Sequence, residues 1–178
     1  MLTIGASATV MLGALYSDVG HGRIPNVLTY PAMVGGLVLG MATGGLPGLG
    51  HSAAGLALGF SVLFLAFMFG GVAGGDVKLA GALGALTGLG TTVLGLMYMG
   101  LLAGVMAFAV MIWKGKLLKS LKNMARFLFT SLMPFLETEH LDEQNSDGFP
   151  LGVAIVLGWA WALVEQQLGV ASVLGLPS

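Results

Sequence analysis

The sequence predicts an all-α, polytopic integral membrane protein with about six transmembrane helices and one amphipathic helix on the cytoplasmic surface. Of its 178 residues, 56% are hydrophobic and only 8% are charged, whereas a soluble domain carries about 25% charged residues. Apolar runs of membrane-spanning length recur along the chain, and the seven Lys and Arg residues fall in connections that one topology places on a single side. We therefore expect residues 1–178 to form one compact membrane domain.

Six apolar segments approach the roughly 17–25 residues that a spanning helix needs. We expect helices at about 1–17, 27–44, 52–70, 77–90, 92–113 and 149–168. The fourth segment is short, which fits a tilted or partly re-entrant helix. Because lipid offers no hydrogen-bond partners to the backbone, helices are the expected spanning element.

The basic residues predict the topology. Arg23 lies in the first connection, Lys78 in the third, and the remaining five lie between Lys114 and Arg126 in the fifth. The second and fourth connections contain no Lys or Arg. Since basic residues favour the cytoplasm, connections one, three and five are predicted to be cytoplasmic.

Residues 114–148 are expected to form a cytoplasmic segment. Apolar residues recur at helical spacing over 114–133 and basic residues occupy the other side, which predicts an amphipathic helix on the membrane surface. The five acids between Glu137 and Asp147 predict a solvated loop. The alternative is a docking surface for a basic segment of a substrate.

Small residues four positions apart occur in several segments. The pairs are Gly36 and Gly40, Gly55 and Gly59, Gly81 and Ala85, and Gly84 and Gly88. This spacing lets helix backbones approach closely, although a glycine-rich chain also contains such pairs by chance.

Two lone acids, Asp18 and Asp76, lie at helix ends on the predicted cytoplasmic side. An acid retained at a membrane is a functional candidate, because its charge is costly there. The glycine-rich approach at 70–75 leaves room beside Asp76 for an extended peptide. The alternative is that both acids have only structural roles at helix ends, stabilised at Asp76 by the helix dipole.

Paired carboxylates can hydrolyse a peptide bond without a metal or a nucleophilic side chain. Two such groups a few ångströms apart cannot both ionise readily, so one activates a water while the other donates a proton. The absence of Cys excludes disulfides and Cys nucleophiles. His51 and His140 fall in connections on opposite sides, so we expect no metal site and no cofactor. The net charge of −1 gives no reason to expect nucleic-acid binding.

In three places the chain resembles the aspartic prepilin peptidases, which are type IV leader peptidases of the GxGD class. The first is Asp18 followed by Arg23-Ile24-Pro25-Asn26, and the second is Gly74-Gly75-Asp76-Val77-Lys78. The third is Phe149-Pro150-Leu151-Gly152-Val153-Ala154-Ile155, which is similar to the run opening the family's last helix. The resemblance implies that Asp18 and Asp76 are the catalytic pair, with Gly74, Gly75, Lys78, Pro25 and Asn26 shaping the site or binding substrate. Lys78 could instead mark the membrane boundary, and Asn26 equally suits a helix N-cap.

The resemblance also implies a substrate and a location. The expected substrate is a prepilin with a basic leader and a hydrophobic helix, cleaved at the cytoplasmic face of the bacterial inner membrane, with lipid as the surrounding partner. The zinc-binding Cys motif of bifunctional relatives is absent, so the chain looks like the short, peptidase-only form that serves tight-adherence (Flp) pili. Ala73 stands where the GxGD pattern has Gly, which places the backbone geometry there in question.

Two other classes of protein remain open on the sequence. A small proton-coupled transporter also uses paired intramembrane acids, although these usually lie nearer the midplane. A non-catalytic membrane protein of pilus or secretion assembly would keep the fold without needing the acids. The sequence does not indicate an oligomeric state.

Overall fold

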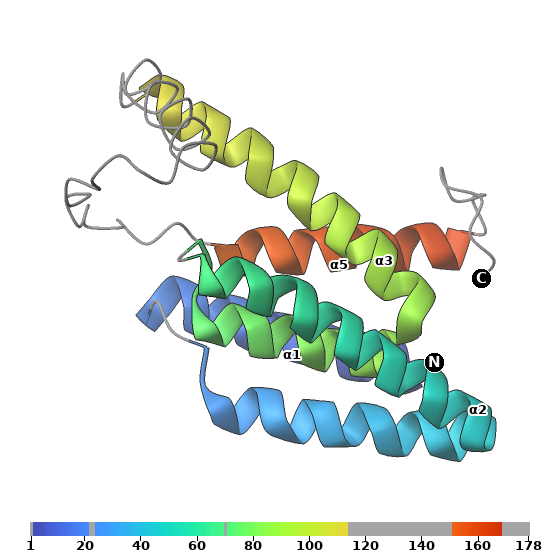
Figure 1. The fold of residues 1–178 in the computed structure, drawn as a ribbon. Helices are drawn as coiled ribbons and strands as arrows, with labels where there is room; N and C mark the ends of the chain where they lie inside the picture. The colour runs from blue at the N-terminus through green and yellow to red at the C-terminus, as the bar shows by residue number, and fades with distance from the viewer. Residues whose placement is uncertain (1, 22–23, 70, 114–150, 169–178) are drawn as a thin grey trace, which may run out of the picture. The chain divides into compact units, whose positions relative to one another are not determined.

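The computed structural model describes residues 2–21, 24–69, 71–113 and 151–168, and these residues form helices and short connections without strands. The helices are α1 (Leu2–His21), α2 (Asn26–Met68), α3 (Gly74–Trp113) and α5 (Leu151–Leu168), as Figure 1 shows. The predicted all-α class is confirmed for this part of the chain. The predicted amphipathic helix at 114–133 and the acidic stretch after it lie outside the described residues.

The chain divides into two compact units. The first contains residues 1–102 and 150–178, and the second contains residues 103–149. Both candidate acids belong to the first unit, which is the one described below.

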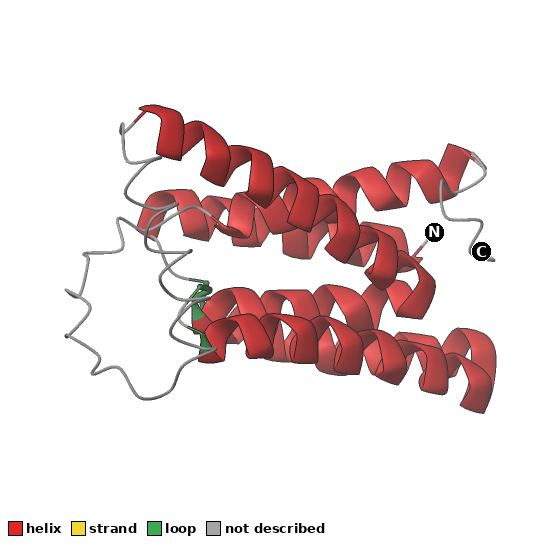
Figure 2. Ribbon diagram, turned by 45° about the horizontal axis from the view of Figure 1, so that its top comes forward, coloured by secondary structure: helices red, strands yellow, loops and turns green. Residues whose placement is uncertain are grey.

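Each of the two long helices is broken by one glycine with a positive φ. In α2 the break is Gly45 (φ 60°, ψ −146°), and in α3 it is Gly88 (φ 77°, ψ 178°). Residues with a side chain rarely adopt this backbone conformation, whereas glycine adopts it without steric penalty. The chain reverses at Gly45, so the two halves of α2 run side by side (Figures 1 and 2). The two connections expected near 44–51 and 87–92 are therefore shorter than the sequence indicates.

The second half of α2 packs against the first half of α3 through glycines. A Cβ added at Gly84 would lie 2.6 Å from the carbonyl carbon of Gly55, and one at Gly59 would lie 3.0 Å from that of Ala80. Gly36, in the first half of α2, meets Ala85 in the same way, with 2.6 Å to its carbonyl carbon. The expected close approach of backbones at small residues is confirmed at these positions.

The core of this unit lies among α1, α2, α3 and α5. It contains Met11 of α1, Leu63 of α2, Leu79 and Leu83 of α3, and Trp159 of α5. Trp159 is fully buried, with its ring against the backbone at Gly95. Many large apolar side chains outside this core are exposed, including Leu12, Val34, Leu101 and Leu157. Such an exposed apolar surface is typical of helices that face lipid.

Hydrogen bonds between side chains join α3 to α5 at the end of the bundle distant from Asp18. The Tyr98 hydroxyl donates to Oε2 of Glu165 at 2.6 Å, and the Thr91 hydroxyl donates to Oε1 of Gln166 at 3.0 Å. Glu165 is 8% exposed. Polar contacts of this kind fix the register of neighbouring membrane helices, and here they fix α5 along α3.

Three helical stretches in the described part of the chain are long and apolar enough to cross a membrane. They are Asn26–Met68, Gly74–Ala109 and Leu151–Leu168. The prediction of a chain built from membrane-spanning helices is confirmed at this level.

The glycine contacts between α2 and α3 generate a stability prediction. Replacing Gly84 by Ala forces the two backbones apart, so we expect the free energy of unfolding to fall by about 1–3 kcal/mol, as overpacking does. Gly35, with no atom within 4 Å of an added Cβ, is the matched control. Gly35→Ala should keep or raise stability by up to about 1 kcal/mol through helix propensity. Thermal unfolding in detergent measures both, and equal effects of the two substitutions would contradict the packing described.

Candidate active site

Asp18 lies in the last turn of α1, where its side chain is half-buried. Its Oδ2 atom is buried and has no hydrogen-bond partner among the described residues. A buried polar oxygen without a partner is uncommon in proteins and is more frequent at functional sites. A solvated position at the end of α1 therefore does not explain the burial of this oxygen atom.

Asp76 lies in the first turn of α3 and is only 6% exposed. Its backbone N–H donates to the carbonyl oxygen of Ala73 at 3.1 Å, and its carboxylate accepts a hydrogen bond from the backbone of Ala73. This reciprocal pattern resembles a capping box, so the proposed structural role of Asp76 at the helix start is present in the structure. That role leaves carboxylate lone pairs available for chemistry.

The exchange of Gly for Ala at position 73 is compatible with this geometry. In the described part of the chain no residue other than glycine has a positive φ, so Ala73 has an ordinary backbone conformation. Its side chain is exposed, and its contribution to Asp76 comes from the backbone. The position therefore does not require the conformational freedom of glycine.

The structure brings the two carboxylates together from separate helices. Asp18 and Asp76 are 58 positions apart in the sequence, yet they lie close enough in the fold for the charge of Asp18 to act on Asp76. Like charges so close in a desolvated place cannot both ionise readily. The pair can thus share a proton, which is the property that carboxylate chemistry on a peptide bond requires.

The segments that follow Asp18 and precede Asp76 pack on each other. A Cβ added at Gly75 would lie 3.2 Å from Cβ of the buried Ile24. Lys78 donates from Nζ to Oδ1 of Asn26 at 2.8 Å, and its Nζ lies 5.3 Å from the centre of the Tyr30 ring. These contacts join the start of α2 and the residue before Pro25 to the start of α3, which carries Asp76.

The residues expected to shape the site differ in whether they take part in the contacts between the starts of α2 and α3. Gly75, Asn26 and Lys78 take part in these contacts, whereas Gly74 approaches only the ring of Phe67, at 3.8 Å. Pro25 is the N-cap of α2 and makes no side-chain capping bond. The alternative reading of Asn26 as an N-cap is wrong, because Asn26 is already the first residue of the helix and its side chain binds Lys78.

The first turn of α5 completes the surroundings of Asp18. Gly152 is buried, and a Cβ added there would lie 2.8 Å from Cγ of Asp18 and closer still to its Oδ2. Sequence reasoning placed Gly152 in the third resembling motif but did not assign it to the site. The signal was present in that motif, but sequence alone could not show that α5 begins against Asp18.

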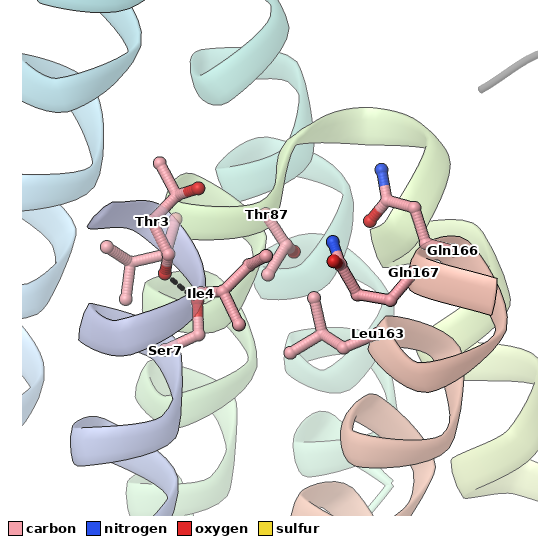
Figure 3. Close-up of a pocket in the computed structure, with 8 residues that line it drawn as sticks. Thr3, Ile4, Ser7, Thr87, Leu163, Gln166 and Gln167 are labelled. Carbon is pink, nitrogen blue, oxygen red and sulfur yellow. Dashed lines mark hydrogen bonds between the residues drawn. The ribbon is translucent and has the colours of Figure 1, made fainter. Parts of the chain in front are cut away.

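A separate pocket of about 280 Å³ lies at the other end of the bundle (Figure 3). It is lined by Thr3, Ile4, Ser7, Leu86, Thr87, Leu163, Gln166 and Gln167. Ser7 is 11 residues before Asp18, or about 16 Å along α1 at 1.5 Å per residue. The hydroxyls of Ser7 and Thr87 donate to the carbonyl oxygens of Thr3 and Leu83 in their own helices. This pocket has no charged group and no nucleophile paired with a base, so the candidate active site is the pair of acids.

Over the described ranges, no group of three or more His, Cys, Asp or Glu side chains is arranged to hold a metal ion. The chemistry that this arrangement supports is acid–base work by two carboxylates.

Comparison with known proteins agrees with this geometry. The model of the type IV leader peptidase family matches residues 6–112, which is more than half of the chain and includes both acids and Lys78. The match ends before α5, so Gly152 lies outside it. No curated protein and no solved structure matches the chain.

The contact between Asn26 and Lys78 can be measured by a double-mutant cycle. We expect Asn26→Ala and Lys78→Met to be coupled by about 0.5–1 kcal/mol, the range for a partly exposed charged contact. Thermal unfolding of the two single variants and the double variant in detergent gives this value. As a control, Thr43→Ala combined with Lys78→Met should be additive, because the Thr43 hydroxyl bonds only within its own helix. Additivity of the Asn26 and Lys78 changes would contradict the contact.

Proposed function

Because the chain belongs to the type IV leader peptidase family, we propose that it is an intramembrane aspartic endopeptidase that removes the leader peptide from type IV-like prepilins. The observation that carries this proposal is the convergence of Asp18 and Asp76 from two helices. Both residues lie inside the stretch that matches the family.

The proposed reaction uses one acid as a base and the other as a proton donor. The ionised carboxylate takes a proton from a water molecule, which attacks the carbonyl carbon of the scissile peptide bond. The protonated carboxyl group donates its proton to the carbonyl oxygen, which gives a tetrahedral intermediate. The first carboxyl group then gives the proton that it took from water to the leaving nitrogen, while the second takes a proton back from a hydroxyl of the intermediate. The C–N bond breaks, and the new amine and the new carboxyl group are released. Neither step needs a cofactor.

We propose that the chain crosses the membrane six times. A continuous helix of the 43 residues of α2 would be about 65 Å long, roughly twice the thickness of the hydrocarbon core. The reversal at Gly45 supports two crossings by α2, and the break at Gly88 supports two by α3. α1 and α5 supply the other two crossings.

The position of the basic residues supports an active site at the cytoplasmic face. Lys78 follows Asp76 by two residues at the start of α3, and Arg23 follows Asp18 by five. Basic residues beside membrane helices favour the cytoplasm. The acids would then meet water and the substrate leader at the inner surface of the bacterial plasma membrane.

The proposed substrate has a basic leader, a small residue at the cleavage point and a hydrophobic helix that stays in the membrane. The negative charge of the acid pair favours approach of the basic leader. These 178 residues contain no Cys for the zinc-binding motif of bifunctional relatives. We propose that they act as the peptidase-only form that serves tight-adherence pili.

Conservative neutralisation of either acid tests this function. We expect Asp18→Asn and Asp76→Asn each to reduce cleavage about a thousandfold or more, as removal of one member of a catalytic unit does. The measurement is the gel shift of a co-expressed prepilin at matched membrane levels of each variant. Asp142→Asn, the same chemical change in the acidic stretch, is the control and should cleave normally.

Persistent processing in either variant would exclude a two-carboxylate mechanism. A wild-type protein that processes none of a panel of prepilins, although it accumulates in the membrane, would instead favour an assembly protein or a transporter.

A further inference from the structure

The Asp18 carboxylate lies against the first turn of α5. Gly152 is the second residue of that helix and is buried. An added Cβ would lie 2.8 Å from Cγ of Asp18 and 3.4 Å from its Cβ. The carboxylate therefore rests against the backbone of this turn, in the space that any other residue would fill with a side chain.

The location of this contact has an electrostatic consequence. Asp18 lies in the last turn of α1, where the partial negative charge of the helix end opposes a carboxylate. The first turn of α5 presents the opposite end of a helix, whose first four N–H groups have no acceptor within the helix. The Oδ2 atom of Asp18 is buried and has no hydrogen-bond partner among the described residues. The start of α5, where Gly152 lies against Asp18, is thus a helix end whose partial charge is opposite to that of the carboxylate.

We propose that Gly152 is a positioning residue for the acid pair: because it lacks a side chain, the start of α5 reaches the Asp18 carboxylate and holds it in place for its work with Asp76. This role rests on the proposed peptidase function, since it concerns the geometry of the same pair. It also assigns α5 to the active site, although this helix lies outside the stretch that matches the family.

The contacts of Gly152 separate this role from a general packing role. An alanine there would collide with the end of the Asp18 side chain, which can rotate away, rather than with a rigid backbone. By contrast, Gly158, which lies further along α5, faces the backbone of Met99. A Cβ added at Gly158 would lie 2.9 Å from the Cα atom of Met99. We therefore expect Gly152→Ala to fold, with Asp18 displaced.

The first measurement is steady-state cleavage of a prepilin peptide by purified protein in detergent. Gly152→Ala should lower kcat about a hundredfold, the cost of misplacing a catalytic group by about an ångström, while KM stays near its wild-type value. The control is Gly100→Ala, which has no atom within 4 Å of the added Cβ and should leave both constants unchanged.

The second measurement does not depend on activity. Dicyclohexylcarbodiimide modifies protonated carboxyl groups in apolar surroundings, and peptide mass spectrometry identifies the residue modified. In wild-type membranes we expect more modification of Asp76 than of Asp18, because Asp76 is the more deeply buried acid and Gly152 keeps Asp18 in its place against α5. In Gly152→Ala the modification of Asp18 should rise several-fold, and in Gly100→Ala it should not.

Wild-type values of kcat and an unchanged modification pattern in Gly152→Ala would overturn the proposal. Failure of Gly152→Ala to accumulate in membranes would also overturn it, because Gly152 would then be required for folding. A rise in Asp18 modification in a protein that cleaves no prepilin would support the positioning role and remove the peptidase function.

Discussion

Two carboxylates held side by side are the constraint on which the rest of this structure depends. Asp76 is almost fully buried and interacts with the charge of Asp18. Such a pair is unfavourable in desolvated surroundings unless a proton is shared or nearby dipoles compensate the charge. Each acid accordingly lies in or against the first turn of a helix. Asp76 lies in the first turn of α3, and Asp18 lies against the first turn of α5.

Glycines allow the end of α1, the start of α3 and the start of α5 to approach one another. Gly75 lets the start of α3 approach Ile24, and Gly152 leaves space for the Asp18 side chain. Deeper in the bundle, Gly55 and Gly84 bring the backbones of α2 and α3 together. In a membrane, where apolar side chains gain little by leaving lipid, such close backbone packing is a main source of helix association. The same residue type therefore supports both the fold and the site.

Much of this arrangement could be predicted from the sequence, and the exceptions have physical causes. The apolar runs indicated the helices, and the two lone acids indicated the pair, because charge is so rare in this chain that each acid is conspicuous. The lengths of the two reversals were overestimated, since a single glycine at 45 or 88 turns the chain. The sequence leaves open whether Asn26 caps α2 or helps to shape the site, and only its contact with Lys78 decides between these roles. Gly152 was missed as a site residue because its role depends on where α5 begins relative to Asp18, and no local pattern encodes that contact.

The proposed mechanism requires Asp18 and Asp76 to be neighbours in the membrane. The chain contains no Cys, so a double variant with Asp18→Cys and Asp76→Cys carries only the two intended thiols. The direct measurement is intramolecular cross-linking of this variant in native membranes by bifunctional methanethiosulfonates of graded length, read by mass spectrometry. The structure predicts cross-linking by the shortest reagents, and none by them when Ser7→Cys replaces Asp18→Cys at the other end of α1. A requirement for long reagents in the Asp18 and Asp76 pair would contradict the account.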